Sequence, residues 1–135
     1  MTEYRSKTVS VNMPAVELFN RITDIQGMLA AVPQDYRNAV QVNGDTVKFS
    51  YAGFNLAIRI SEKTPFTRVA YSDVEAPFHF TATVHLDPAD VISRTSLWVE
   101  LSADLNFMMK TLIGSKIQEY LDKVVTAIGS GGVLR

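Results

Sequence analysis

The chain contains two histidines, His79 and His85, and no cysteine. They lie six residues apart in a segment that alternates apolar and polar side chains, which places both on one face of a strand. At ~3.3 Å per residue the two are roughly 20 Å apart, too far for both imidazoles to bind one metal ion. That face also carries Thr81 and Thr83, and we expect it to be solvated, which argues against acid–base catalysis. The absence of cysteine excludes disulfides, thiolate metal sites and cysteine nucleophiles.

Asp73 and Glu75 are the carboxylates best placed for chemistry. Strict alternation puts them on the same strand face as Tyr71, where a buried carboxylate could orient a polar ligand group or act as a base. The alternative is that alternation breaks before Ala76-Pro77 and turns both carboxylates to solvent in a loop. We favour this alternative, because strand ends are the least certain part of a sequence-based assignment.

Three aromatic residues have two interpretations each. Tyr51 and Tyr71 share the apolar side of their strands, where a phenol gives a ligand one fixed hydrogen bond or belongs to an ordinary core. Trp98 falls on the polar side of the last strand with Glu100, and it is either packed by its neighbours or marks a partner contact.

Composition and motifs exclude several classes of function. The net charge of −1 and the absence of a Lys/Arg cluster argue against nucleic acid and against recruitment to an anionic membrane. No Gly-rich phosphate loop, GxSxG elbow, HExxH or metal-spaced carboxylate cluster is present, so we expect no cofactor and no metal. No apolar run approaches the ~20 residues of a membrane span, and the polar N-terminus lacks a signal peptide. We therefore expect a cytoplasmic protein.

The element that must organise these residues is a helix over Asn106 to Gly129. Its periodicity predicts one apolar face, consisting of Ile113, Ile117, Tyr120, Leu121, Val124 and Ile128. Before Gly114 the helix is apolar nearly all round, through Phe107, Met108, Met109 and Leu112. Ile113 and Ile117 fit core packing, whereas Met108, Met109 and Leu112 fit a cavity wall or an interface as well as a core.

Most of the remaining chain predicts strands. Tyr4 to Val11 suits a first strand, followed by a helix that begins near Asn12-Met13-Pro14 and a second short helix over Ile25 to Ala31. Period-two alternation then predicts a meander with turns at Asn43-Gly44 and at Lys63-Thr64-Pro65. Its strands are predicted at about Ala39–Val42, Val47–Tyr51, Phe54–Ile60, a segment around Val69–Tyr71, Phe78–Leu86 and Ser93–Leu105. At 135 residues this is one domain, predicted over residues 1–129, with a flexible tail at 130–135.

This order of elements resembles the START-like superfamily, which includes the birch-pollen-allergen and polyketide cyclase/dehydrase groups. The resemblance covers roughly Ser6 to Ile128. It is found in TVSVNMPAVELFNRITDI, FNLAIRISEKTPFTRVAY and LWVELSADLNFMMKTLIGSKIQEYLDKV. It implies an α+β helix-grip fold, with a six- to seven-stranded antiparallel curved sheet around a long C-terminal helix and two short helices after the first strand.

The resemblance also implies a cavity between sheet and helix that holds an apolar small molecule. We expect it to be lined by Phe49, Tyr51, Leu56, Tyr71, Asp73, Phe80, Val99, Met108, Met109 and Leu112. The leading hypothesis is non-catalytic binding or transport of a hydrophobic or amphipathic ligand. The alternatives are a polyketide cyclase- or dehydratase-like enzyme that uses Asp73 with Tyr71 or Tyr51, and a partner-binding protein of the chaperone-activator type. A homodimer is left open.

Overall fold

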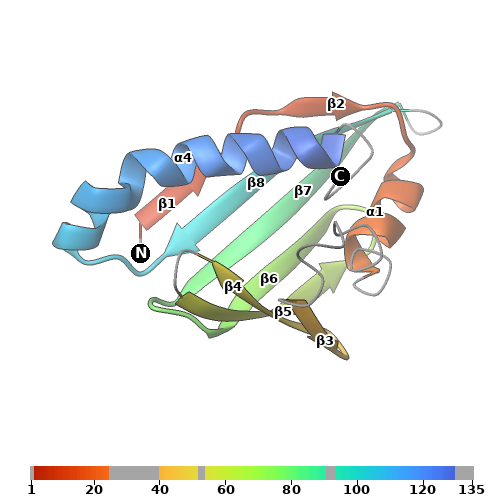
Figure 1. Cartoon of the computed structure of the whole chain (residues 1–135). Helices are drawn as coiled ribbons and strands as arrows, with labels where there is room; N and C mark the ends of the chain where they lie inside the picture. Colours follow the sequence, from red (N-terminus) through yellow and green to blue (C-terminus); the bar gives the residue numbers. More distant parts are fainter. Residues whose placement is uncertain (1, 25–39, 52–53, 91–93, 130–135) are drawn as a thin grey trace.

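The architecture is that of one antiparallel sheet with a long helix laid across its concave face (Figure 1). The structure is a computed structural model that describes residues 2–24, 40–51, 54–90 and 94–129. In this part of the chain the strands are β1 Thr2–Arg5, β2 Val9–Val11, β3 Val40–Asn43, β4 Thr46–Tyr51, β5 Phe54–Thr64, β6 Arg68–Glu75, β7 Phe80–Asp90 and β8 Arg94–Ala103. The helices are α1 Ala15–Thr23 and α4 Phe107–Gly129.

The sheet has the order β1-β8-β7-β6-β5-β4-β3, with β2 also paired to β8. The helix-grip class is therefore confirmed, but the described sheet has eight strands instead of six or seven. The extra strand arises because the first predicted strand is interrupted. Arg5 is paired with Glu100 of β8, and Val9 is paired with Leu97 of β8. The segment between β1 and β2 therefore has one residue more than the segment of β8 that it faces, which is a β-bulge.

Ser6 holds this bulge in place. It is buried, and its backbone N–H donates to the carbonyl of Val99 at 2.8 Å while its Oγ accepts from the Val99 N–H at 2.8 Å. The side chain thus replaces the backbone acceptor that a regular ladder would provide. As a result, both halves of the edge stay attached to β8.

The predicted Asn-Gly turn and one short helix are confirmed, whereas the turn predicted at Lys63-Thr64-Pro65 begins two residues later, because Lys63 and Thr64 belong to β5. Gly44 has φ of 62°, as the predicted Asn-Gly turn requires. In the turn after Pro65, Phe66 has φ of 66°, and its ring meets that of Phe19 edge-on at 5.6 Å. The predicted second helix at Ile25–Ala31 and the tail at 130–135 lie outside the described residues.

The main core lies at the end of the concave face where α1 meets the later turns of α4. Side chains from α1, the sheet and α4 form one buried cluster there: Val11, Leu18, Phe19, Ile22, Ile60, Val69, Val84, Leu86, Leu97, Val99, Leu121, Val125 and Ile128. One predicted member of the α4 face is wrong, since Tyr120 is exposed and Val125 is buried instead. Among the described elements, α4 packs mainly against β1, β2 and β8, on one side of the sheet.

Candidate functional site

At the other end of the concave face, the apolar side chains are only half-buried. This end is formed by β4, β5, the start of β7, the end of β8 and the first turns of α4. Its half-buried members are Phe49, Leu56, Ile58, Phe80, Ala82, Leu101, Met109 and Ile113. We call this set the open end, and the buried cluster around α1 the closed end.

Strand register explains why these residues share one surface. Phe49 is paired with Leu56 across β4 and β5, and Ala82 is paired with Leu101 across β7 and β8. Leu56, Ala82 and Leu101 have the same parity as buried residues further along their strands, which are Ile60 on β5, Val84 on β7 and Val99 on β8. The two ends are therefore one continuous apolar face, of which only the closed end is fully covered.

The predicted site residues do not all lie in this region. Phe49, Leu56, Tyr71, Asp73, Phe80 and Met109 are half-buried on the concave side or at its rim, whereas Val99 is fully buried in the closed end. Met108 and Leu112 are exposed, and the side chain of Tyr51 lies outside the described residues. Ala82 and Leu101 belong to the open end but were not predicted, although the alternation of their strands placed them on the right face.

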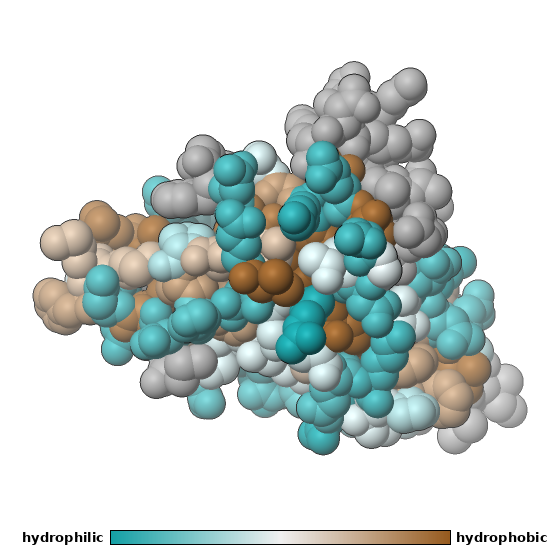
Figure 2. Space-filling model, turned by 90° about the horizontal axis from the view of Figure 1, so that it is seen from below, coloured by the Kyte–Doolittle hydropathy of each residue, from teal (hydrophilic) through white to brown (hydrophobic). Residues whose placement is uncertain are grey.

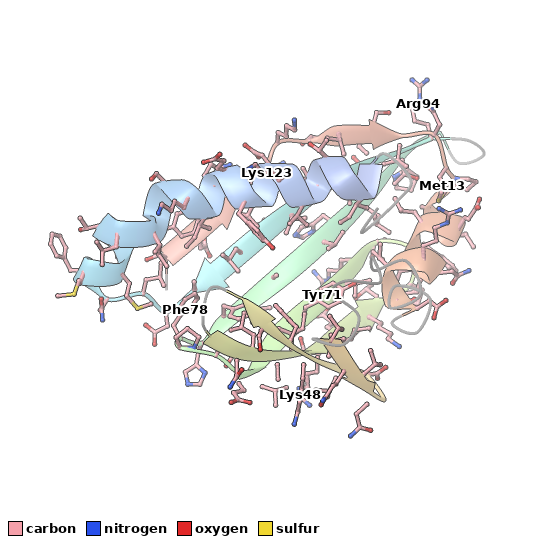
Figure 3. All side chains as sticks on the ribbon, viewed as in Figure 1. Met13, Lys48, Tyr71, Phe78, Arg94 and Lys123 are labelled. Atoms are coloured by element: carbon pink, nitrogen blue, oxygen red, sulfur yellow. The ribbon has the colours of Figure 1, made fainter. Side chains whose placement is uncertain are left out.

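Tyr71 lies between the two ends, and its hydroxyl already makes a hydrogen bond within the fold. The phenol donates a hydrogen bond to the backbone carbonyl of Ile22 at the end of α1, and Figure 3 shows the residue in the middle of the sheet. Burial raises the pKa of Tyr71 well above its ordinary value, because a phenolate would lose its hydration there. Tyr71 is consequently a neutral tether between sheet and helix, and it is poorly suited to proton transfer.

Asp73 is also engaged in the fold. The expectation that Asp73 and Glu75 lie in a loop is wrong, since both are in β6, although Glu75 is exposed. The Asp73 carboxylate accepts from the Phe80 N–H at 2.8 Å and contacts His79 Nδ1 at 2.8 Å. The backbone of His79 in turn accepts from the Asp104 N–H at 2.8 Å. Asp73 thereby fastens the β6–β7 turn, next to the segment that leads into α4.

Charge and hydrogen bonding explain the ionisation of this pair. Partial burial pushes the pKa of Asp73 upward, but the hydrogen bonds from Phe80 and His79 and the charge of His79 outweigh it. The pKa of Asp73 therefore lies below its ordinary value. Its hydrogen bond and negative charge raise the pKa of His79. The carboxylate is stabilised as an anion, which makes it a weak base.

The convex face of the sheet carries the second histidine. His85 was expected to be solvated, but its ring stacks on Trp98 at 5.0 Å between ring centroids and its Nε2 contacts Glu100 at 2.6 Å. Arg5 covers the Trp98 ring at 5.0 Å, so Trp98 is packed by neighbours, as one of its two interpretations required. A polar hollow of about 280 Å³ lies beside them over Thr81 and Thr83, and its charged groups include the Arg68–Glu62 and His85–Glu100 pairs.

Two further findings concern the described residues only. No three His, Asp or Glu side chains within residues 2–24, 40–51, 54–90 and 94–129 come together in a way that could hold a metal ion. Within the same ranges, neither helix is long and apolar enough to cross a membrane.

Comparison with solved structures supports the helix-grip fold. The chain is similar to Thalictrum flavum norcoclaurine synthase, with 9% identity, a TM-score of 0.76 and coverage of 96% of this chain and 92% of that one. It is similar to the di-domain ARO/CYC protein BexL of the BE-7585A biosynthetic pathway, with 12% identity, a TM-score of 0.72 and coverage of 96% and 46%.

A third similar structure is the Aha1 dimer from Colwellia psychrerythraea, with 14% identity, a TM-score of 0.64 and coverage of 97% and 98%. No family model and no curated protein matches the sequence. At these identities the similarity establishes the fold, and the function has to be argued from the site.

Proposed function

We propose that the protein binds a hydrophobic or amphipathic small molecule against the open end of the concave face, between the sheet and the first half of α4. One observation carries this proposal: a continuous apolar face is completely covered at one end and only half-buried at the other. Apolar side chains left in contact with water cost free energy that a bound apolar molecule would recover. A site of this kind typically encloses on the order of a few hundred Å³.

The residues at the open end favour a ligand with an apolar body. Phe49, Leu56, Phe80 and Met109 supply aromatic, aliphatic and thioether surface, and the unbranched Met side chain can adapt to ligands of different shape. Phe78 lies near Phe80, with 6.0 Å between ring centroids, below the first turns of α4 in Figure 3. Aromatic side chains at the edge of such a surface suit a flat or chain-like hydrocarbon.

Binding fits the site better than catalysis does. The polar groups proposed for an enzyme were Asp73 with Tyr71 or Tyr51. Tyr71 and Asp73 are each committed to structural hydrogen bonds, and their pKa values are shifted away from neutrality. The side chain of Tyr51 lies outside the described residues. A general base works best with a pKa near the operating pH. The norcoclaurine synthase structure, solved with a transition state analogue, supports an organic ligand on a fold of this kind, and the choice of binding over catalysis rests on Tyr71 and Asp73.

Filling the open end with a larger side chain tests the proposal. We expect Ala82→Phe, on the concave face of β7, to weaken binding of a fluorescent fatty-acid probe at least tenfold, because the ring would occupy ligand space. The matched control is Thr83→Phe, which places the same ring on the convex face one residue away, and its affinity should match wild type. Circular dichroism would confirm that both variants fold.

Native mass spectrometry of protein purified from its own host gives an independent result. A retained apolar molecule in the wild type and its loss in Ala82→Phe would support the proposal. Equal probe affinity for the wild type and both variants would refute it.

A further inference from the structure

The first two turns of α4 expose three large apolar side chains at one end of the molecule. Phe107 is 84% exposed, Met108 is 69% exposed and Leu112 is 65% exposed. Figure 2 shows hydrophobic surface gathered at the end of the molecule where α4 begins. We call Phe107, Met108 and Leu112 the apolar tip. Packing among the described residues does not explain these three side chains, because a polar side chain at each position would leave the described core unchanged.

The charged side chains in the first three turns of α4 are lysines. Lys110 and Lys116 are the ionisable side chains between Leu105 and Gln118, and α4 has no acidic residue in its first turn. Asp104, just before the helix, acts on His79, whose pKa its negative charge helps to raise. The chain as a whole has a net charge of −1 and no Lys/Arg cluster, so its charge alone does not recruit it to an anionic membrane. Apolar side chains on a helical segment whose charged residues are lysines nevertheless match the interface of an anionic bilayer, where hydrocarbon lies beneath phosphate groups.

The size of the apolar tip favours a bilayer over a stable protein partner. Three exposed side chains make a patch on the order of a few hundred Å². A stable protein interface buries about 800 Å² on each partner. Insertion into a membrane interface needs no matching partner surface, and a small apolar contact gives weak, reversible attachment.

We propose that the apolar tip docks reversibly on the surface of an anionic lipid bilayer and that the open end exchanges its ligand there. The exchange part of this inference rests on the proposed function. Met109 and Ile113, on the same two turns of α4, are half-buried and belong to the open end. A molecule leaving the bilayer at the apolar tip would therefore reach the binding surface along one helix, with little exposure of its apolar body to water.

Vesicle co-sedimentation of the full chain tests the docking. Wild-type protein should sediment with vesicles of phosphatidylcholine containing phosphatidylglycerol, and at least fivefold less with vesicles of phosphatidylcholine alone. The double variant Met108→Glu, Leu112→Glu should lose most of this binding. Val16→Glu is the matched control, because Val16 is also an exposed apolar helical residue but lies on α1, at the other end of the molecule. It should bind as wild type does.

Two additional measurements separate the competing explanations. Lys110→Glu with Lys116→Glu should reduce binding to the anionic vesicles while leaving the fold intact. Analytical ultracentrifugation of the wild type shows whether the apolar tip joins two copies instead. A dimer that the double variant dissociates, without vesicle binding, would overturn the inference in favour of self-association.

Absence of wild-type binding to the anionic vesicles would also overturn it, as would binding that survives Met108→Glu, Leu112→Glu. These outcomes leave the proposed function intact, because ligand retention is measured on the isolated protein. Conversely, if the protein binds vesicles but holds no ligand, the docking part of the inference would be supported and the ligand-exchange part would be refuted.

Discussion

The two ends of the concave face are made from the same kinds of residue but differ in how they are covered. At the closed end, Leu18, Leu97 and Leu121 interlock between α1, the sheet and α4. At the open end, Leu56 and Leu101 lie on the same sheet but remain half-buried. Leu112, in the apolar tip on the adjoining turns of α4, is exposed. Residue type alone therefore does not distinguish core from site. The difference comes from which other element reaches over each part of the sheet.

This division allows stability and function to be separated along one helix. The later turns of α4 supply Leu121, Val125 and Ile128 to the core, so substitutions there act on folding. The earlier turns contribute little buried area and are free to serve binding. Proteins commonly place functional surfaces in segments where the folded state depends least on them.

The largest expected effect comes from comparing two leucines on α4. Leu121 is 7% exposed and belongs to the buried cluster, whereas Leu112 is 65% exposed. We expect Leu121→Ala to lower the free energy of unfolding by about 2–4 kcal/mol, through lost burial and the cavity that remains. Leu112→Ala should change it by less than ~0.5 kcal/mol, as exposed positions usually do. Urea denaturation at one pH measures both.

Both variants change leucine to alanine on the same helix. The difference between their losses in the free energy of unfolding therefore reports how completely each side chain is buried by neighbouring elements. Equal losses in the two variants would show that the first half of α4 is part of the core, and the distinction between the two ends would fail. If Leu112→Ala instead lowered the affinity for the fluorescent fatty-acid probe without changing stability, the first half of α4 would serve binding and not folding.

Much of this fold was predictable, because alternation and helical periodicity are local properties of the chain. The turn at Asn43-Gly44, the strand faces of Phe49 and Val99, and the helix from Phe107 to Gly129 all follow from them. The bulge at Ser6 was not predictable, since it depends on a hydrogen bond to Val99, far away in sequence. Tyr120 was wrongly predicted to be buried, because helical periodicity allows two neighbouring faces of α4 to be the apolar one. Which face is buried depends on how α4 packs on the sheet.

The candidate site was less predictable, for a reason of the same kind. Parity placed Tyr71 and Asp73 on the correct side, but it gave no information that their polar atoms are bound to Ile22, Phe80 and His79. Those contacts join separate elements and decide whether a group is available for chemistry. Parity also treats Val99 and Leu101 alike, although one is buried and the other half-buried.

Tyr71→Phe tests the tether at the boundary between the two ends. Removing the hydroxyl leaves the Ile22 carbonyl without its partner, and we expect a loss of about 1–2 kcal/mol in the free energy of unfolding. The pKa of Tyr71 is raised in the folded state, so its contribution is fully present below the unfolded pKa of about 10 and is lost as the pH rises through the folded value. Wild-type stability should therefore fall above about pH 10.

The alkaline loss of stability should be smaller in Tyr71→Phe, which has no phenol to ionise at this position. Denaturation curves at about pH 8 and pH 11 measure it, with Tyr120→Phe as a control on an exposed tyrosine. Parallel pH profiles for the wild type and Tyr71→Phe would contradict the tether.

The smallest expected effect concerns the turn beside the open end. The side chain of Asp73 is 13% exposed and holds the Phe80 N–H, whereas that of its partner His79 is 85% exposed. We expect Asp73→Ala to cost about 1 kcal/mol, because the Phe80 N–H loses its acceptor. His79→Ala should leave stability nearly unchanged, since an exposed ion pair contributes little. Urea denaturation of both variants at neutral pH measures this.

The pH dependence of the wild type gives a second measure of the same contact. Since the folded pKa of Asp73 is lowered, its contribution is present above the unfolded pKa of about 4 and is lost as the pH falls through the folded value. Asp73→Ala should lack that part of the acid-induced loss, and it should bind the probe more weakly if the turn positions Phe80 for the ligand. Unchanged stability with unchanged probe affinity would mean that the open end forms without this contact, and that coverage by α4 alone defines it.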